Sequence, residues 1–290
     1  MKQVRSASGF AFVAPFLLLY AFLQLYPLVR GIIISLHRVD LFGGGHFVGL
    51  ANYGEILGDP VFGQAVVNTL LVTLMIVPPL TVLALLLALA LNNATRSSAI
   101  YRGLFFSSSV LSVTIVTLIW RFVLAPDSGL VGEALKATGH EPLPFLSDAH
   151  LVLPAIALTT IWWSIGLPMI LFLAGLQQIP ADMYEAAALD RSSRWTTLRK
   201  ITLPAIRRTT LLVVMLQTAS QLQLFGQSQL LTAGGPGGAS RTMVFFIYET
   251  AFVRWQLGYA AAGAEILFVM ILMVTLIQYV TINRDREEAR

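Results

Sequence analysis

A polar stretch in the middle of the chain, EAAALDRSSRWTTLRKITLP, carries the residue types best suited to a specific contact. It runs from Glu185 to Pro204 and holds two carboxylates and four cations, whereas residues 151–176 and 209–231 hold no charge at all. Ala186 and Ala187 are small enough to let another surface approach closely, and Glu185 places a polar group beside them. These types indicate a docking element for a partner protein. The alternative is a solvated loop whose amphipathic helices rest on lipid headgroups.

The same stretch predicts two short helices joined by a turn. Pro180 suits the first turn of a helix, and Asp182 places negative charge near its N-terminus. A turn is predicted at 190–193, and either serine of that turn is able to cap a second helix. Pro204 is predicted to end the second helix before the next apolar block. That helix has apolar residues at a spacing of three, which give it one apolar face: Trp195, Leu198 and Ile201.

The elements that position this loop are predicted to be membrane-spanning helices. Of 290 residues, 56% are hydrophobic and 12% charged, against about 25% charged in a soluble domain. Within lipid every backbone polar group has to be bonded inside its own segment, which favours helices with tolerated proline kinks. We expect an all-α integral membrane protein, one domain over 1–290, with the polar loop at about 178–207. Six spans are predicted, at about 10–36, 66–91, 104–124, 151–176, 209–231 and 259–282.

The distribution of lysine and arginine predicts the orientation. The two tails, the loop between spans two and three, and the loop between spans four and five up to Arg208 together hold 13 of the 19 cations. By the positive-inside rule, both termini and the polar loop are expected in the cytoplasm of a bacterial inner membrane protein. The four histidines then fall in outside loops without metal-ligand spacing, and no metal site is expected.

Several chemistries are absent from the sequence. There is no cysteine, no nucleotide-binding G-x-x-x-x-G-K-[ST] pattern and no catalytic set within the spans. Glu265 is the one clear carboxylate inside a predicted span, whereas an ion-coupled carrier usually buries more ionisable groups. We therefore expect no enzymatic activity, and an energy source on another chain if the protein moves a solute.

The polar loop resembles the EAA loop of binding-protein-dependent ABC importer permeases. The family pattern reads roughly E-A-A-x-x-D-G-A, nine residues, then I-x-L-P. This chain keeps seven of its residues at unbroken spacing: Glu185, Ala186, Ala187, Asp190, Ile201, Leu203 and Pro204. Arg191 replaces the family glycine and Ser192 the next alanine. Since arginine with positive φ costs about 1 kcal/mol or more, either the turn has another geometry or Arg191 makes its own contact.

Two further stretches resemble the carbohydrate branch of that family, which imports maltose, other sugars or glycerol-3-phosphate. FVGLANY, residues 47–53, is similar to the outside-loop signature of the first of its two permease subunits, and Asn68-Thr69 opens the second span as in that branch. LTAGGPGGASRT, residues 231–242, resembles the pattern that follows the fifth span. Gly234, Gly235 and Pro236 are the candidates for contact with a binding protein.

The resemblance implies the type I importer permease fold and a set of partners. These are a second, homologous permease subunit, two copies of a cytosolic ABC ATPase, an extracytoplasmic substrate-binding (lipo)protein and a sugar-like solute, with no nucleic acid. ATP and Mg²⁺ would lie on the ATPase, so this chain is expected to bind no cofactor. The first helix of the loop would be the coupling helix that sits in a groove of the ATPase. The residues assigned to this contact are Glu185, Ala186, Ala187, Leu189, Asp190 and Arg191.

The translocation path is expected among polar and aromatic residues of the later spans. Amides both donate and accept hydrogen bonds, which suits sugar hydroxyls; the alternative is that these groups bond neighbouring helices. The candidates are Gln217, Ser220, Gln221, Ser228, Trp162 and Glu265. Two other functional classes remain open at this point, a secondary carrier working without ATP and a membrane scaffold that conducts nothing.

Overall fold

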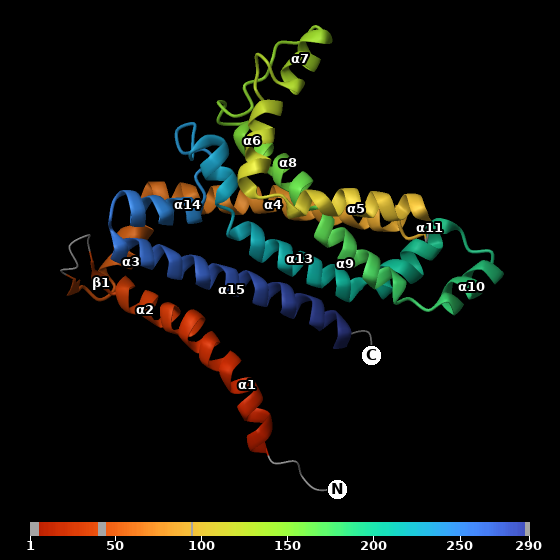
Figure 1. Ribbon diagram of the computed structural model, residues 1–290, viewed down its shortest axis with the longest axis horizontal. Helices are drawn as coiled ribbons and strands as arrows, with labels where there is room; N and C mark the ends of the chain where they lie inside the picture. Colours follow the sequence, from red (N-terminus) through yellow and green to blue (C-terminus); the bar gives the residue numbers. More distant parts are fainter. Residues whose placement is uncertain (1–5, 40–44, 94, 288–290) are drawn as a thin grey trace. The chain divides into compact units, whose positions relative to one another are not determined.

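The computed structural model describes residues 6–39, 45–93 and 95–287, and nearly all of its regular structure is helical (Figure 1). The chain divides into two compact units. The first unit is Met1–Phe62 with Phe246–Val269, and the second unit is Gly63–Phe245 with Met270–Arg290. Three helices run from one unit into the other along the chain: α4 (Pro60–Ala90), α14 (Met243–Tyr248) and α15 (Leu257–Glu287).

The first unit is built on the N-terminal helical stretch and the start of α15. Its β-hairpin is antiparallel and pairs His37 with Phe47 and Arg38 with His46. Aromatic packing fills its interior, since the rings of Phe62 and Phe246 meet edge to face with centroids 5.3 Å apart. Its other elements are α1 (Ser6–Tyr20), η1 (Ala21–Leu25), α2 (Tyr26–Ser35), β1 (His37–Arg38), β2 (His46–Phe47), α3 (Ala51–Leu57) and η4 (Glu249–Val253).

The second unit holds the remaining helices. Within it, α9 packs against α5 and α13, and α6 packs against α8 and η3 (Figure 1). Its elements are α5 (Arg96–Val110), α6 (Val113–Val123), α7 (Leu130–Ala137), α8 (Val152–Ser164), α9 (Gly166–Gln177), α10 (Ala181–Leu189), α11 (Arg194–Thr197), η2 (Leu198–Thr202), α12 (Leu203–Ala205), α13 (Arg207–Leu222) and η3 (Ser228–Thr232).

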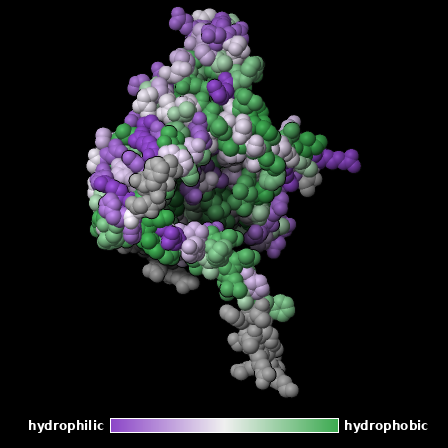
Figure 2. Space-filling view, turned by 60° about the vertical axis from the view of Figure 1, so that its left-hand side comes forward, coloured by the Kyte–Doolittle hydropathy of each residue, from purple (hydrophilic) through white to green (hydrophobic). Residues whose placement is uncertain are grey.

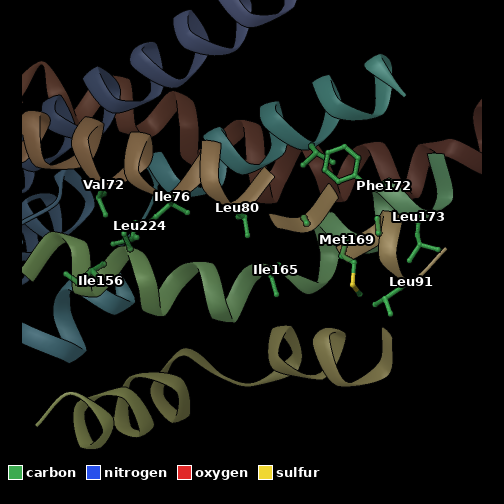
Figure 3. Close-up of a cluster of buried hydrophobic side chains, with 14 of the residues drawn as sticks. Val72, Ile76, Leu80, Leu91, Ile156, Ile165, Met169, Phe172, Leu173 and Leu224 are labelled. Atoms are coloured by element: carbon green, nitrogen blue, oxygen red, sulfur yellow. The ribbon is translucent and has the colours of Figure 1, made fainter. Parts of the chain in front are cut away.

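One apolar core holds the second unit together (Figure 3). Val72, Ile76 and Leu80 lie on one side of α4, at the spacing of four that gives a helix a continuous stripe. They meet side chains of α8 and α9, among them Ile156 and Phe172. Each of these side chains is fully buried. Full burial of one such side chain contributes about 1.5–3 kcal/mol to stability.

Outside the cores, the surface is apolar to an extent unusual for a protein in water. Figure 2 shows hydrophobic side chains across much of the visible face. Among the large apolar side chains, Phe12 is 89% exposed and Leu74 67% exposed. Contiguous exposed apolar surface of this kind marks contact with lipid or with partner chains.

Three described helices are long and apolar enough to cross a membrane, or up to five if each bent pair forms one span. The three are Phe12–Ser35, Pro60–Ala90 and Leu257–Thr281, which match the first, second and sixth predicted spans to within a few residues. The fourth predicted span is α8 and α9, bent by 49° at Ile165.

The third predicted span, 104–124, is wrong as a single helix. It consists of α5, which begins at Arg96, and α6, which are bent by 101° between Val110 and Val113. The backbone groups freed by this break are bonded locally, as a low-dielectric environment requires. Ser112 caps α6, and the indole nitrogen of Trp163 donates to the Leu111 carbonyl at 3.0 Å.

The fifth predicted span, 209–231, is not one helix either. Helix α13 ends at Leu222, and helical turns resume at Gly226 and continue through η3. Gly226 allows the close approach of another segment, because a Cβ there would lie 2.7 Å from a methyl carbon of Val113. The break is stabilised by side chains: Gln223 donates to the Ala219 carbonyl at 2.9 Å and Thr242 to the Leu224 carbonyl at 2.7 Å.

Candidate functional site

Helix α10 presents the predicted docking residues. Ala187 is buried, whereas Glu185, Ala186 and Asp190 are exposed. Leu189 is 86% exposed, which leaves an apolar side chain at the end of a polar helix without cover from this chain. The helix therefore offers one small residue to the body of the protein and a mixed apolar and acidic face to its surroundings.

The turn after α10 has the left-handed geometry that normally uses glycine. Arg191 has a φ of +51°, and it is one of three described non-glycine residues with positive φ. Its N–H donates to the Ala188 carbonyl and the N–H of Ser192 to the Ala187 carbonyl, both at 3.0 Å. These two bonds form a Schellman motif with Arg191 as the left-handed residue. The first of the two possibilities raised by the sequence, a different turn geometry, is therefore wrong: the turn is kept and arginine adopts it.

The second arm of the loop begins as predicted and ends within one residue of the predicted position. Ser193 caps α11 by accepting the N–H of Thr196 at 3.2 Å. The predicted apolar face is divided, since Trp195 is 68% exposed while Leu198 is half-buried. The arm ends at Ala205, one residue after Pro204, which lies inside α12 behind the wide π-turn η2. A wide turn accommodates a residue that has no N–H and whose ring would clash with the carbonyl four residues earlier.

A polar cavity of about 290 Å³ lies at the break after α13. We call it the α13 cavity. It lies where α13 ends and the next helical segment begins. Seven of its eleven lining residues carry a hydroxyl, amide or indole group, and none is ionisable: Val113, Thr160, Trp163, Ser164, Ser220, Gln221, Gln223, Leu224, Phe225, Gly226 and Gln227.

The structure brings only some of the predicted path residues to this cavity. Ser220 and Gln221 line it, and the amide of Gln221 donates to that of Gln217 at 3.3 Å just behind. Ser228 is fully buried and donates to the Ser240 carbonyl instead. Trp162 packs edge to face on Trp120 with centroids 5.9 Å apart, and its neighbour Trp163 is the tryptophan in the wall.

Glu265 belongs to the first unit and lies against α2. One of its carboxylate oxygens is 3.1 Å from the position that a Cβ of Gly31 would occupy. Among the residues that the structure describes, no group of three or more His, Cys, Asp or Glu side chains is arranged to hold a metal ion.

The Gly-rich loop after η3 is held by the second predicted span. Asn68 donates to the carbonyls of Gly238 at 2.9 Å and Arg241 at 3.0 Å. Thr69 accepts the N–H of Met243 at 2.9 Å. Of the predicted contact residues, Gly234 is buried, and Gly235 and Pro236 are half-buried. In the sequence, Asn68-Thr69 and this loop each resemble the same family branch, but nothing in the sequence predicts that they touch. Their contact becomes visible only in the tertiary structure.

Comparisons with known proteins cover nearly the whole chain. Residues 56–285 match the family model described as binding-protein-dependent transport system inner membrane component. The chain is 31% identical to the lactose transport system permease protein LacF of Rhizobium radiobacter, covering 99% of this chain and 97% of that protein. It is 32% identical to the multiple sugar-binding transport system permease protein MsmF of Streptococcus mutans, covering 96% of each.

A solved structure has the same fold. It is a chain of a bacterial alginate ABC transporter in complex with a periplasmic protein that carries an alginate pentasaccharide. The TM-score is 0.82 at 21% sequence identity, over 93% of this chain and 91% of the other. At this identity the match speaks for the fold alone.

Proposed function

Since this chain belongs to the family of binding-protein-dependent transport system inner membrane components, we propose that it is the transmembrane permease subunit of an ATP-driven importer for a sugar or sugar-like solute. An extracytoplasmic binding protein delivers the solute, and two cytosolic ATPases and a second, homologous permease complete the assembly. The relatives named for lactose and for multiple sugars support the solute class. Both termini lie in the cytoplasm, and the chain itself holds neither ATP nor Mg²⁺.

The exposed surface of α10 is the observation that carries the coupling role. A single short helix places Glu185, Ala186 and Leu189 in the open, on a predicted cytoplasmic loop of a chain without a nucleotide site of its own. Closure of the ATPases pulls on this helix, and the rigid Schellman turn passes the movement to α11 and on to α13. The α13 cavity forms this chain's wall of the solute path.

The experiment is uptake by the complete transporter in liposomes, with the binding protein and the sugar outside and ATP inside. The Glu185→Gln variant keeps the shape and removes the charge, and we expect ATP-driven uptake to fall at least ten-fold. Glu133→Gln is the matched control, because Glu133 is an exposed glutamate of α7 that pairs with Lys136 on its own helix. Its uptake should equal that of the wild type.

Three results would contradict the proposal in different ways. If Glu185→Gln transports normally, the coupling role of that residue is wrong, although the transport function stands. If the wild-type permease takes up sugar at the same rate without the ATPase, the protein is a secondary carrier. If no combination of the partners gives uptake of any sugar, the protein is a membrane scaffold that conducts nothing.

A further inference from the structure

A second cavity lies within the first unit, and the transport cycle proposed above leaves it without a role. It measures about 450 Å³, within the range of sites that hold small molecules. We call it the α3 cavity, because α3 contributes part of its wall. It opens where α2, α4 and α15 have their predicted extracytoplasmic ends. The residues that carry the argument are Arg38, Glu55, Asp59, Arg254, Gln256 and Tyr259.

The charges around the α3 cavity cancel. Arg38 forms an ion pair with Glu55. Asp59 accepts the hydroxyl of Tyr259 at 3.1 Å with one oxygen and the N–H of Val61 at 2.8 Å with the other. Arg254 is the second cation of the lining and lies 3.7 Å from Glu249 beside the cavity, so the lining itself holds two positive and two negative side chains. A simple anion or cation therefore gains little from the field of this cavity.

The same groups are well suited to hydroxyls. A guanidinium has five donors, a carboxylate about four acceptor sites and an amide both kinds, so each retains capacity after the contacts above. Gln256 adds the amide, beside two guanidinium and two carboxylate groups. Neighbouring hydroxyls of a sugar ring each need a donor and an acceptor at fixed spacing, and planar side chains of these three types supply both.

The backbone around the cavity is held in place before any ligand arrives. Asn52 donates to the carbonyls of Ser35 at 2.7 Å and His37 at 3.0 Å, which fastens the end of α2 to α3. Gly258 completes this packing, because a side chain there would overlap the His37 carbonyl. The FVGLANY stretch, which contains Asn52, thus shapes the cavity. Fixed walls reduce the ordering cost of binding.

A strained aromatic residue stands beside the cavity. Trp255 has a φ of +59° and is 44% exposed, between the lining residues Arg254 and Gln256. A bulky residue in left-handed conformation is unfavourable and persists only where its surroundings impose it, a pattern that clusters at ligand sites. Its exposed ring also provides a fluorescence reporter next to the wall.

We propose that the α3 cavity is a saccharide-binding site, formed by residues other than those of the α13 cavity, that takes an uncharged sugar on the predicted outer side of the membrane. The inference rests on the proposed function for the class of solute. It assigns Arg38, Glu55, Asp59 and Gln256 as hydrogen-bonding partners of the sugar and leaves the step of translocation to the α13 cavity.

The test measures sugar binding to the complete transporter in nanodiscs, without ATP and without the binding protein. Lactose and maltose are the probes, glycine betaine is the non-sugar control, and all variants carry Gln221→Ala to weaken the α13 cavity. Tryptophan emission is recorded with and without Trp255→Phe, which separates the signal of that ring from the other tryptophans of the complex, four of which are in this chain. Saturation-transfer NMR on the sugar protons measures binding independently.

We expect a sugar to change the emission of Trp255, and Glu55→Gln and Gln256→Ala each to weaken binding at least five-fold by both methods. Glu133→Gln, an exposed paired glutamate elsewhere, should bind as the parent does. Two variants of different chemistry keep the test valid if one of them folds poorly. The ATP-driven uptake of wild-type protein is measured in parallel, so that failure of transport itself is recognised separately.

Either of two results would overturn the inference. One is the absence of any sugar-dependent Trp255 signal and NMR transfer while the wild-type protein, measured in parallel, transports normally. The other is unchanged sugar binding in Glu55→Gln and Gln256→Ala while stimulation of the ATPase by the binding protein is lost. That second result would assign the α3 cavity to contact with the binding protein instead.

Discussion

At the scale of single residues, Arg191 has a left-handed backbone conformation that normally favours glycine over arginine. Left-handed geometry costs an arginine about 1–2 kcal/mol. Its positive charge at the C-terminus of α10 offsets about 0.3–1 kcal/mol through the helix dipole. The strain is the larger of the two, so the turn is held at a net cost that its two backbone bonds and its surroundings overcome.

A substitution series at Arg191 separates strain from charge. Arg191→Gly relieves the strain and should stabilise the loop by roughly 0.5–1 kcal/mol. Arg191→Ala keeps the strain and removes the charge, so it should destabilise the loop by about 0.3–1 kcal/mol. Hydrogen exchange of the amides in 181–205 gives the opening free energy of the loop in each variant. Equal protection in all three proteins would mean that φ at this position carries no cost.

Gln221 distinguishes a solute contact from a bond between helices. If its amide touches the sugar, Gln221→Ala should raise the KM for uptake at least ten-fold with little change in expression or melting temperature. If it only bonds neighbouring groups, the loss is about 0.6 kcal/mol of stability with an unchanged KM. Gln177→Ala is the control, since Gln177 is an exposed amide at the end of α9, outside the cavity.

At the scale of elements, the first turns of α4 act as the support of the Gly-rich loop. Asn68 alone bonds two carbonyls of that loop. Removing a partner from buried carbonyls costs about 1–3 kcal/mol. The face that the loop presents is therefore set by α4, although the two lie about 170 residues apart in sequence.

Asn68→Ala should loosen the loop without unfolding the helix. We expect faster hydrogen exchange in 234–242 and at least a five-fold weaker response of the ATPase to the binding protein, while basal ATP hydrolysis is unchanged. Thr73→Val is the control, because it also removes a buried polar group from α4. The Thr73 hydroxyl has no hydrogen-bond partner in the described residues, so its loss should leave the loop unchanged. If Thr73→Val loosens the loop as much as Asn68→Ala, the two bonds of Asn68 do not hold it.

At the scale of the whole molecule, hydrophobicity predicted the positions of the apolar spans better than the course of the backbone within them. The spans at 12–35, 60–90 and 257–281 follow from long apolar runs. The breaks at Leu111 and Gln223 do not, because the length of an apolar run says nothing about a change of direction within it. The sequence near these breaks predicts them only weakly, through polar residues in an apolar run. These are the serines at 107–109 and 112 and the glutamines at 221 and 223.

The candidate sites divide in the same way. Capping and turn rules predicted the helices of the polar loop, since the bonds involved lie within a few residues of one another. The α13 cavity needed tertiary structure, because Val113, Trp163 and Gln227 reach it from different segments. The wide π-turn before Pro204 had no sequence rule to predict it beyond the proline itself.

The wall of the α13 cavity has a consequence for ion selectivity. It lacks any charged side chain, so a phosphorylated or carboxylated solute that sheds its hydration water there meets dipoles and no counterion. Dehydrating an ion without compensation costs several kcal/mol. We expect the wild-type transporter to import neutral sugars at least ten-fold faster than their phosphate esters, as measured by competition uptake. Gln227→Arg adds a positive charge to the wall and should reduce the ratio of these two uptake rates. In the proposed path, this wall would work as a dielectric filter, which sorts solutes by how tightly they hold water before any hydroxyl is recognised.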